Sequence, residues 1–409
     1  SSAGERQPEL WKVYSKWAKQ EVPSCNTEDL CRMVRALCRV QYLKKPLLNA
    51  IKRRVRSPEV DGLSPRLFSQ LLSDLRRLRF IDAPMLQDML RHWRFHEKLE
   101  EVSAFDLSLL LIAFARSSMR DEDSVSAIGR ALRQKSSEVS ASAAAGSLYA
   151  LALLDVTDET GVFLVAKVLP RCLGQSSNQE LVNIAFALVV LDLPGGELLS
   201  FALERLAPQA ESLDTVGVHA LRIVAHAVKY PEALRPRMRQ SFEDVEVKRR
   251  CVKGLQQVLL KTHRMVIQCP TMSSKLQKAL ERYFQELQVP HLHEQAVGPY
   301  VPDFVLPLKI AVEVDGYTHF YAFSQRLTAK SELKRRILRA LGWGVVSLPH
   351  FHWLELGHQE KLVFLIEQIE EVSQSSLSVV QRTPLEGFSP PLHRSFDRRP
   401  KGKLYGHQR

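Results

Sequence analysis

The chain has 409 residues, a length that predicts two or three domains, or a repeat array followed by one domain. Hydrophobic residues make up 45% and charged residues 25%, which excludes a wholly disordered chain, and no run approaches the ~20 consecutive apolar residues of a membrane-spanning helix. Lys and Arg number 57 against 45 Asp and Glu, so the net charge of +12 favours a polyanionic partner, with a merely basic soluble protein as the alternative.

A repeat of about 37 residues dominates the first part of the chain. Helical apolar runs begin after six short polar residues that can cap a helix, Asn26, Ser64, Ser103, Ser140, Ser177 and Asp214. The intervals between them are 38, 39, 37, 37 and 37 residues, and a break followed by a second helix comes after each run. Because a two-helix unit cannot bury its apolar face alone, the pattern predicts an α-solenoid over residues 1–236. A non-repetitive helical bundle is the alternative.

Charge is distributed unevenly along this array. Residues 32–56 contain nine basic residues and no acidic one, whereas residues 139–220 contain nine acidic and three basic residues. Because clustered Lys and Arg bind nucleic acids by releasing counterions from phosphates, we expect the first repeats to contact RNA and the middle repeats to support the array or contact protein. The RNA-binding candidates in the first repeats are Arg32, Arg35, Arg39, Lys52, Arg53 and Arg54.

The six cysteines indicate a reducing compartment and no structural metal. None belongs to a Cys-x-x-Cys pair, and none has a His spaced as a zinc partner. Cys31 and Cys38 lie in an apolar helical pattern, which is typical of buried thiols. We also expect that an organellar transit peptide preceded Ser1 and was removed.

Strand patterns are confined to the C-terminal part. Residues 237–290 remain helical and predict a connector. After it, the expected order is two strands within residues 301–316, a basic helix at 330–341, a strand at 344–348 and a last helix at 354–372. Pro307 divides the two strands, and Gly342 ends the basic helix. Strands mixed with helices predict a small α/β domain over residues 291–373.

Several separated motifs in this region resemble one known family. In chain order they are Asp303-Phe304, Ile310-Ala-Val-Glu313-Val-Asp315-Gly316, His319-Phe320, Leu327-Thr328-Ala-Lys330, Lys334-Arg335-Arg336, Leu341-Gly342-Trp343 and Val345-Val346-Ser347-Leu348-Pro349. Together they resemble the RAP domain, which is named as an RNA-binding domain abundant in apicomplexans. The resemblance implies a restriction-endonuclease-like fold, upstream helical repeats of the octotricopeptide or heptatricopeptide kind, and a role with organellar RNA. The predicted fold class is therefore mainly α, an α-solenoid of two-helix repeats followed by a small α/β domain.

Three carboxylates raise the question of catalysis. Glu313 and Asp315 lie two apart on a strand and point to the same face, and Asp303 on the preceding strand could join them. In the nucleases that the RAP fold resembles, such carboxylates hold Mg²⁺, but the usual lysine position is occupied here by Asp315. His319 is the candidate base in its place. The alternative is a tight turn at Asp315-Gly316 whose carboxylates accept hydrogen bonds from nearby N–H groups, and the sequence favours an inactive scaffold.

The basic helix and the aromatic residues before it predict a second RNA contact. Its phosphate-binding candidates are Lys330, Lys334, Arg335, Arg336 and Arg339. Tyr317, His319 and Tyr321 can stack on unpaired bases. The alternative is an ordinary solvated helix surface.

The last segment, residues 374–409, has a different composition. Residues 382–409 contain seven Lys or Arg, two acids and four prolines, with no helical period, so in isolation the segment would be disordered. Threading through folded RNA is one way to order such a tail. Its RNA-binding candidates are Arg394, Arg398, Arg399, Lys401 and Lys403.

We therefore expect a non-catalytic RNA-binding protein of the mitochondrial matrix, a structural or assembly component of a ribonucleoprotein such as the mitochondrial ribosome. Its expected partners are ribosomal RNA and neighbouring proteins. The sequence contains no P-loop, dinucleotide fingerprint or nucleophile triad, so no cofactor is expected. Two alternatives stay open: a metal-dependent RNA-processing endonuclease, and a helical scaffold that binds only protein.

Overall fold

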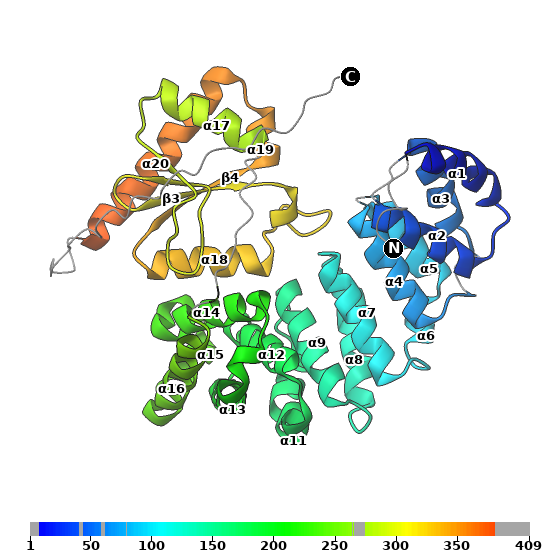
Figure 1. Cartoon of the computed structure of the whole chain (residues 1–409), viewed down its shortest axis with the longest axis horizontal. Helices are drawn as coiled ribbons and strands as arrows, with labels where there is room; N and C mark the ends of the chain where they lie inside the picture. The colour runs from blue at the N-terminus through cyan, green and yellow to red at the C-terminus, as the bar shows by residue number, and fades with distance from the viewer. Residues whose placement is uncertain are drawn as a thin grey trace.

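The computed structural model of the chain describes residues 8–40, 44–58, 62–78, 80–263, 265 and 275–380. Two-helix units follow one another from the N-terminus, and a small sheet with its own helices lies against them (Figure 1). The expected mainly α fold with a small α/β domain is confirmed. Within the described ranges, no helix is both long enough and apolar enough to cross a membrane.

The helices of the array alternate between two layers. The first helices of the units are α2 (Thr27–Val40), α4 (Pro65–Arg77), α7 (Ala104–Arg116), α9 (Ala141–Leu154), α12 (Asn178–Val190) and α14 (Thr215–Lys229). The second helices are α3 (Lys45–Val55), α5 (Ala83–His92), α8 (Glu122–Gln134), α10 (Glu159–Phe163) continued by α11 (Leu169–Cys172), α13 (Gly196–Leu206) and α16 (Val245–Lys261). Helix α1 (Pro8–Glu21) precedes the array, and the short helices α6 (Phe95–Lys98) and α15 (Pro236–Gln240) complete it. Each first helix packs against the next one, which makes the core continuous.

The six polar residues that set the repeat period all cap helices. Asn26 accepts a hydrogen bond from the Asp29 N–H at 2.8 Å. The side chains at the other five positions accept in the same way from the third residue of their helix, at the starts of α4, α7, α9, α12 and α14. Ser177 forms the full capping box, because Glu180 in turn accepts from the Ser177 N–H. The period of the sequence is thus the period of the helix starts.

The expected connector, residues 237–290, divides between two cores. Helix α16 buries Cys251, Leu255 and Val258 within the array. Helix α17 (Lys275–Glu286) instead places Leu280 and Phe284 in the core of the sheet.

The sheet has four strands in the order β1 (Leu292–His293), β2 (Phe304–Leu306), β3 (Ile310–Asp315) and β4 (Gly344–Pro349). Strand β2 pairs antiparallel with both β1 and β3, whereas β3 and β4 pair parallel and are joined through α18 (Ala329–Ala340). The turn after Pro307 reverses the chain with positive φ at Leu308 and Lys309. The strands and the basic helix lie where the sequence predicted them, but β1 was not predicted.

Helices cover both faces of the sheet. Helices α17, α19 (His350–Glu355) and α20 (His358–Val380) lie on one face, and α18 lies on the other, between the sheet and the array (Figure 1). Side chains alternate accordingly: Val312 packs with Phe284, while its neighbour Ala311 packs with Leu338 of α18. On the array side, α18 contacts α9 and α12.

Candidate nucleic-acid interface

Glu313 and Asp315 lie on the face of β3 that α18 covers. Both are deeply buried, with 3% and 1% of their surface exposed. They share this face because they are two residues apart on one strand, as predicted. A buried carboxylate is costly unless it is paired, so the surroundings of these two residues decide what the site can do.

Helix α18 supplies the partners of both carboxylates. The Nζ of Lys334 lies 2.6 and 2.7 Å from the two carboxylate oxygens of Glu313 and 3.3 Å from the Val301 carbonyl oxygen. The next residue of α18, Arg335, forms an ion pair with Asp315 and also donates to the Ser347 hydroxyl. Two of the predicted phosphate-binding residues are therefore bound to the protein's own carboxylates.

The two carboxyl groups have shifts of pKa in opposite directions. Burial raises the pKa of Glu313 to about 7, and the Lys334 ammonium opposes this shift only in part. Burial also acts to raise the pKa of Asp315. There, however, hydrogen bonds from His319 and Ser347 and the charge of Arg335 outweigh burial, so the pKa of Asp315 lies below its usual value. Environments that separate the pKa values of neighbouring acids are typical of functional sites.

Asp303 does not join these two acids. Its Oδ2 accepts a hydrogen bond from the Val314 N–H at 2.7 Å, and its Oδ1 accepts one from Gln277 of α17. Within the described residues, the group of three side chains whose metal-binding atoms converge lies elsewhere and contains none of these acids. The predicted three-carboxylate metal cluster is therefore not assembled, because Asp303 is held toward α17. The lysine that the sequence pattern lacked is nevertheless present in space, since Lys334 stands beside Glu313.

These side chains enclose a cavity of about 190 Å³ between β3 and α18. Its lining residues are Tyr300, Glu313, Asp315, His319, Lys330, Ser331, Lys334 and Arg335. His319 is half-buried in the wall, with its Nδ1 3.2 Å from Asp315. Lys330 is exposed, and it is the cation of this cavity that remains open to a polyanion.

The two tyrosines expected to stack on bases serve the packing of the sheet domain on the array. Tyr321 is only 2% exposed: its hydroxyl donates to the Leu153 carbonyl oxygen at 2.8 Å and accepts from the Ala329 N–H at 3.0 Å. In this structure the ring is therefore not open to an unpaired base, and the predicted contact with RNA stays a prediction. Tyr317 is half-buried beneath the guanidinium of Arg76 from α4, which lies 5.4 Å from the ring centroid.

Further contacts of this loop fix it between the units. The N–H of Ala322 donates to the Ser118 carbonyl oxygen at 2.7 Å. Asp155, at the end of α9, forms ion pairs with Arg326 of the loop and with Arg235 of the array, each with 2.6 Å between nitrogen and oxygen. The loop of residues 317–328 is thus a docking element in this structure.

The side chains of Arg336 and Arg339 point from α18 in different directions, one into the array and one to solvent. The Arg336 guanidinium is turned into the array and donates to the Val190 carbonyl oxygen at 3.3 Å. Burial, together with the charge of Arg235, lowers the pKa of Arg336 to about 10. Arg336 is therefore half-buried in this structure, and only part of its side chain is open to a phosphate. Arg339 is exposed.

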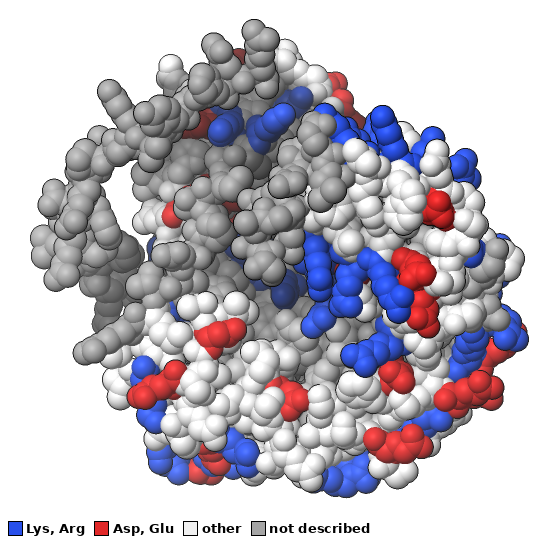
Figure 2. Space-filling model, turned by 45° about the vertical axis from the view of Figure 1, so that its right-hand side comes forward, with Lys and Arg blue, Asp and Glu red and all other residues white. Residues whose placement is uncertain are grey.

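The basic residues of the first repeats are more open. Arg35 and Arg39 on α2, and Arg53 on α3, are all exposed. Figure 2 shows Lys and Arg side chains gathered across the middle of one face of the molecule. A hollow of about 410 Å³ on α3 is lined by Asn49, Lys52, Arg53 and Arg56. This surface presents positive charge that a phosphate backbone can reach.

Acids from outside residues 32–56 neutralise some of these cations. Asp82 forms an ion pair with Lys52, and Asp88 of α5 lies 2.6 Å from the Nε of Arg56. Arg54 is half-buried and donates to the Cys25 carbonyl oxygen at 3.0 Å. Residues 32–56 contain no acid of their own, but the fold brings Asp82 and Asp88 next to them.

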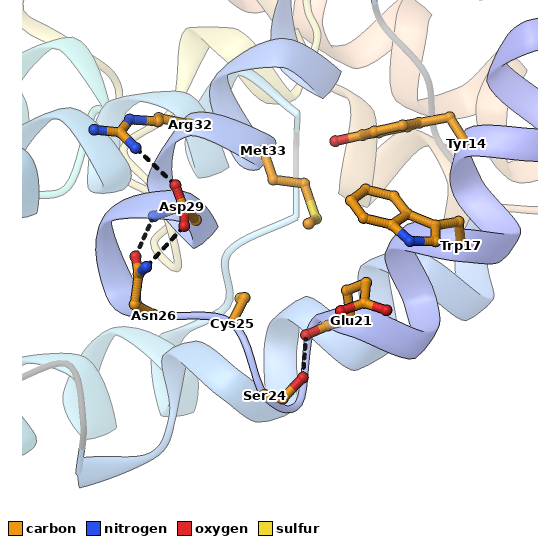
Figure 3. Close-up of a pocket in the computed structure, with 9 residues that line it drawn as sticks. All are labelled: Tyr14, Trp17, Glu21, Ser24, Cys25, Asn26, Asp29, Arg32 and Met33. Carbon is orange, nitrogen blue, oxygen red and sulfur yellow. Dashed lines mark hydrogen bonds and ion pairs between the residues drawn. The ribbon is translucent and has the colours of Figure 1, made fainter.

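Arg32 borders a cavity of about 530 Å³ between α1 and α2. The side chain points away from the aromatic residues of this cavity and pairs with Asp29 at 2.7 Å (Figure 3). Trp17, with 52% of its surface exposed, lies beside Tyr14 and opposite Met33 in the same cavity. Sequence reasoning did not single out Trp17 as a candidate for stacking on a base. The signal was the series Trp11, Tyr14 and Trp17, which places aromatic rings on one helix face next to the basic residues.

Arg394, Arg398, Arg399, Lys401 and Lys403 lie outside the described residues, as does Cys269. The five cysteines in the described part are free thiols, and Cys31 and Cys38 are buried as predicted.

Comparison with known proteins places one family in this region. The family model of the RAP domain matches residues 312–368, which include most of β3 and all of α18 and β4. A protein named "RAP domain-containing protein, chloroplastic" from Oryza sativa subsp. japonica is 34% identical over 118 residues. The similarity covers 28% of this chain and 18% of the rice protein, so the chain spans under a fifth of that relative's length.

Proposed function

From a chain that carries a RAP domain at residues 312–368, we propose a non-catalytic RNA-binding protein that works in an organelle. The observation that carries the proposal is the RAP match itself, which supplies the class of ligand. The exposed cations support it from two separate regions: Arg35, Arg39 and Arg53 on the array, and Lys330 and Arg339 on α18.

The physical basis of binding is electrostatic attraction supplemented by stacking. Exposed Lys and Arg side chains neutralise phosphates and release counterions, which makes affinity fall steeply with salt. Trp17 adds an exposed ring on which an unpaired base can stack, a contact worth about 1–3 kcal/mol per base. Single-stranded RNA is therefore the form that this surface suits best.

A salt series with variants tests the proposal. Binding of a fluorescently labelled single-stranded RNA of mixed sequence is measured at several salt concentrations for the full chain. Replacing Arg35, Arg39 and Arg53 together by Ala is expected to flatten the slope of log affinity against log salt by about 2, since each phosphate contact to single strands contributes about 0.7. Arg249→Ala on α16 is the matched control, because Arg249 is also exposed and pairs with Glu246 of its own helix. Equal slopes for all three proteins would contradict the proposal.

The same experiment distinguishes the protein-scaffold alternative. A chain that binds only protein has no measurable affinity for the labelled RNA, and its association with a protein partner changes little with salt. Crosslinking to RNA, mapped by mass spectrometry, adds the location. We expect crosslinks at Trp17, on α2 and α3 and at Lys330, and none at the buried Tyr321.

The finer assignment is to the mitochondrial matrix, where the protein would contact ribosomal RNA as a structural or assembly component of a ribonucleoprotein such as the mitochondrial ribosome. The chloroplastic name of the rice relative supports an organelle, and the resemblance to RAP proteins that act on organellar RNA supports this class of partner. Sedimentation of an organelle extract tests it. We expect the protein to migrate with a large particle and to shift to light fractions after ribonuclease treatment, whereas light migration before treatment would contradict this assignment.

A second candidate function is cleavage of the bound RNA at the cavity between β3 and α18. The observation that favours it is Glu313, whose pKa is raised to about 7 beside Lys334 and His319. A group with such a pKa can exchange protons near neutral pH. The test is incubation of the protein with RNA and Mg²⁺ or Mn²⁺. Cleavage that disappears when Glu313 and Asp315 are both replaced by Ala would replace the non-catalytic proposal, and intact RNA would exclude this candidate.

A further inference from the structure

A separate group of metal-binding side chains lies between α17 and the edge strand β1. Glu281 comes from α17, His293 from β1, and His291 from the residues just before β1. The metal-binding atoms of the three side chains all lie within 4.8 Å of one another. In the part of the chain that the structure describes, this is the only such group of three.

Local structure explains why these residues meet. Residues two apart on an extended chain point to the same side, which brings His291 and His293 together next to α17. Phe304 lies opposite His293 in the strand register, with ring centroids 4.4 Å apart, and Phe284 lies 5.2 Å from His291. Glu281 is one helical turn before Phe284, so its carboxylate reaches the same place.

The imidazole of His291 is already oriented as that of a metal ligand. The Nδ1 of His291 donates to the Val289 carbonyl oxygen at 2.9 Å, which leaves the lone pair on its Nε2. A hydrogen bond from the second ring nitrogen to a backbone carbonyl is the usual companion of a histidine that binds a metal. The Nε2 of His293 lies 3.1 Å from the Oε1 of Glu281.

We propose that Glu281, His291 and His293 form a Zn²⁺ site that pins β1 to α17. Two imidazoles and one carboxylate are a known ligand set for zinc, with water in the fourth position. Bond lengths of about 2.0–2.1 Å place tetrahedral ligand atoms about 3.3 Å apart. His293 and Glu281 already meet this spacing, and small side-chain rotations bring in the third ligand.

The position of the site fits a structural role. Strand β1 has only two residues and forms one edge of the sheet, so it has few backbone hydrogen bonds of its own. A metal ion bound by ligands from both elements would fix this edge to the helix. Entry from solvent is open, since the side chains of His293 and Glu281 are 39% and 37% exposed. The cysteine pattern predicted no metal, but the ligands here are imidazoles and a carboxylate.

Cobalt substitution tests the site in the full chain. The untagged protein is freed of metal with a chelator and titrated with Co²⁺, whose visible absorption reports tetrahedral coordination, and Zn²⁺ is then added as a competitor. We expect one saturable equivalent of Co²⁺ that Zn²⁺ displaces. His293→Ala and Glu281→Gln should each weaken binding by about tenfold or more, the scale seen even for the outer partners of metal ligands.

His358→Ala is the matched control. The Nε2 of His358 lies 3.0 Å from the Oε1 of Glu286, a residue of α17 like Glu281. His358 nevertheless belongs to no converging group of three among the described residues. Its variant should bind one equivalent as the parent protein does. Glu281→Gln keeps the size of the side chain and an oxygen that accepts from His293, so it decides the matter if His293→Ala does not fold. No tight equivalent in the parent protein, or equal affinity in Glu281→Gln and His358→Ala, would overturn the proposal.

Discussion

Two basic segments of this protein look alike in the sequence and are used differently by the fold. In α18, Lys334 and Arg335 bind buried carboxylates of β3, and Arg336 turns into the array. In α2 and α3, Arg35 and Arg53 face solvent. The three cations named in α18 thus bind groups of the protein itself, whereas Arg35 and Arg53 are open to a polyanion.

The difference lies in what packs against each helix. Helix α18 is covered on both sides, by a strand with two acids and by the array. Helices α2 and α3 bury mainly their apolar stripes, so Arg35, Arg39 and Arg53 stay on the outer surface, whereas Arg54 is half-buried. A cluster of Lys and Arg in a sequence therefore predicts a binding surface only where no acidic or polar layer covers the helix.

The largest expected effect comes from cutting an internal ion pair. Arg335→Ala leaves Asp315, almost fully buried, without a cationic partner from α18. We expect the free energy of unfolding to fall by about 3–5 kcal/mol, the range observed when one partner of a buried pair is removed. Urea unfolding followed by circular dichroism measures it. If Arg335→Ala lowered the free energy of unfolding no more than the replacement of a surface arginine does, the two basic segments would not differ.

Glu313 should give the protein a pH-dependent stability. Because burial raises the pKa of Glu313 from 4.5 to about 7, the folded state binds this proton more tightly than the unfolded state does. The contribution to stability is full below about pH 4.5 and is lost as the pH rises to about 7, a change on the order of 1–3 kcal/mol. Glu313→Gln should flatten the curve of unfolding free energy in this window. An unchanged slope would mean that Lys334 neutralises the effect of burial.

Tyr321→Phe tests whether the aromatic loop docks on the array. The substitution removes one hydroxyl that serves both Leu153 and Ala329, and it leaves buried backbone groups without a partner. We expect a loss of about 1–2 kcal/mol in unfolding free energy and unchanged RNA affinity. Weaker RNA binding with unchanged stability would restore the stacking role that the sequence predicted.

The smallest effect on stability is expected at the exposed segment. Arg53→Ala should change the unfolding free energy by no more than about 0.5 kcal/mol, as surface substitutions usually do. Its RNA affinity should nevertheless fall at low salt, with the salt slope reduced by about 0.7. Arg53→Ala should thus lower RNA affinity with little loss of stability, whereas Arg335→Ala should lower stability strongly.

The helical array could be predicted from the sequence because its signals are local. A capping side chain and an apolar stripe act within one helix, and the cap at Ser177 is an example that the structure confirms. Strand β3 and helix α18 were also recognisable from their apolar and basic patterns. Strand β1 was missed because two residues carry no period.

The site was less predictable because it depends on contacts between distant residues. Nothing near Lys334 in the sequence indicates that it meets Glu313, and nothing near Arg326 indicates Asp155, which is 171 positions away. Tyr321 has an aromatic ring that could stack on a base, but contact with the array buries it. Exposure was therefore the property that the sequence could not supply.

The docked loop has a mechanical consequence. Solenoids normally bend through small rotations between adjacent units. Here Tyr317 receives Arg76 of α4, Ala322 binds Ser118 after α7, and Tyr321 binds Leu153 of α9, so the loop acts as a splint across three units. The loop therefore restrains rotation between the units that begin with α4, α7 and α9, and bending of the array is left to the units before and after them.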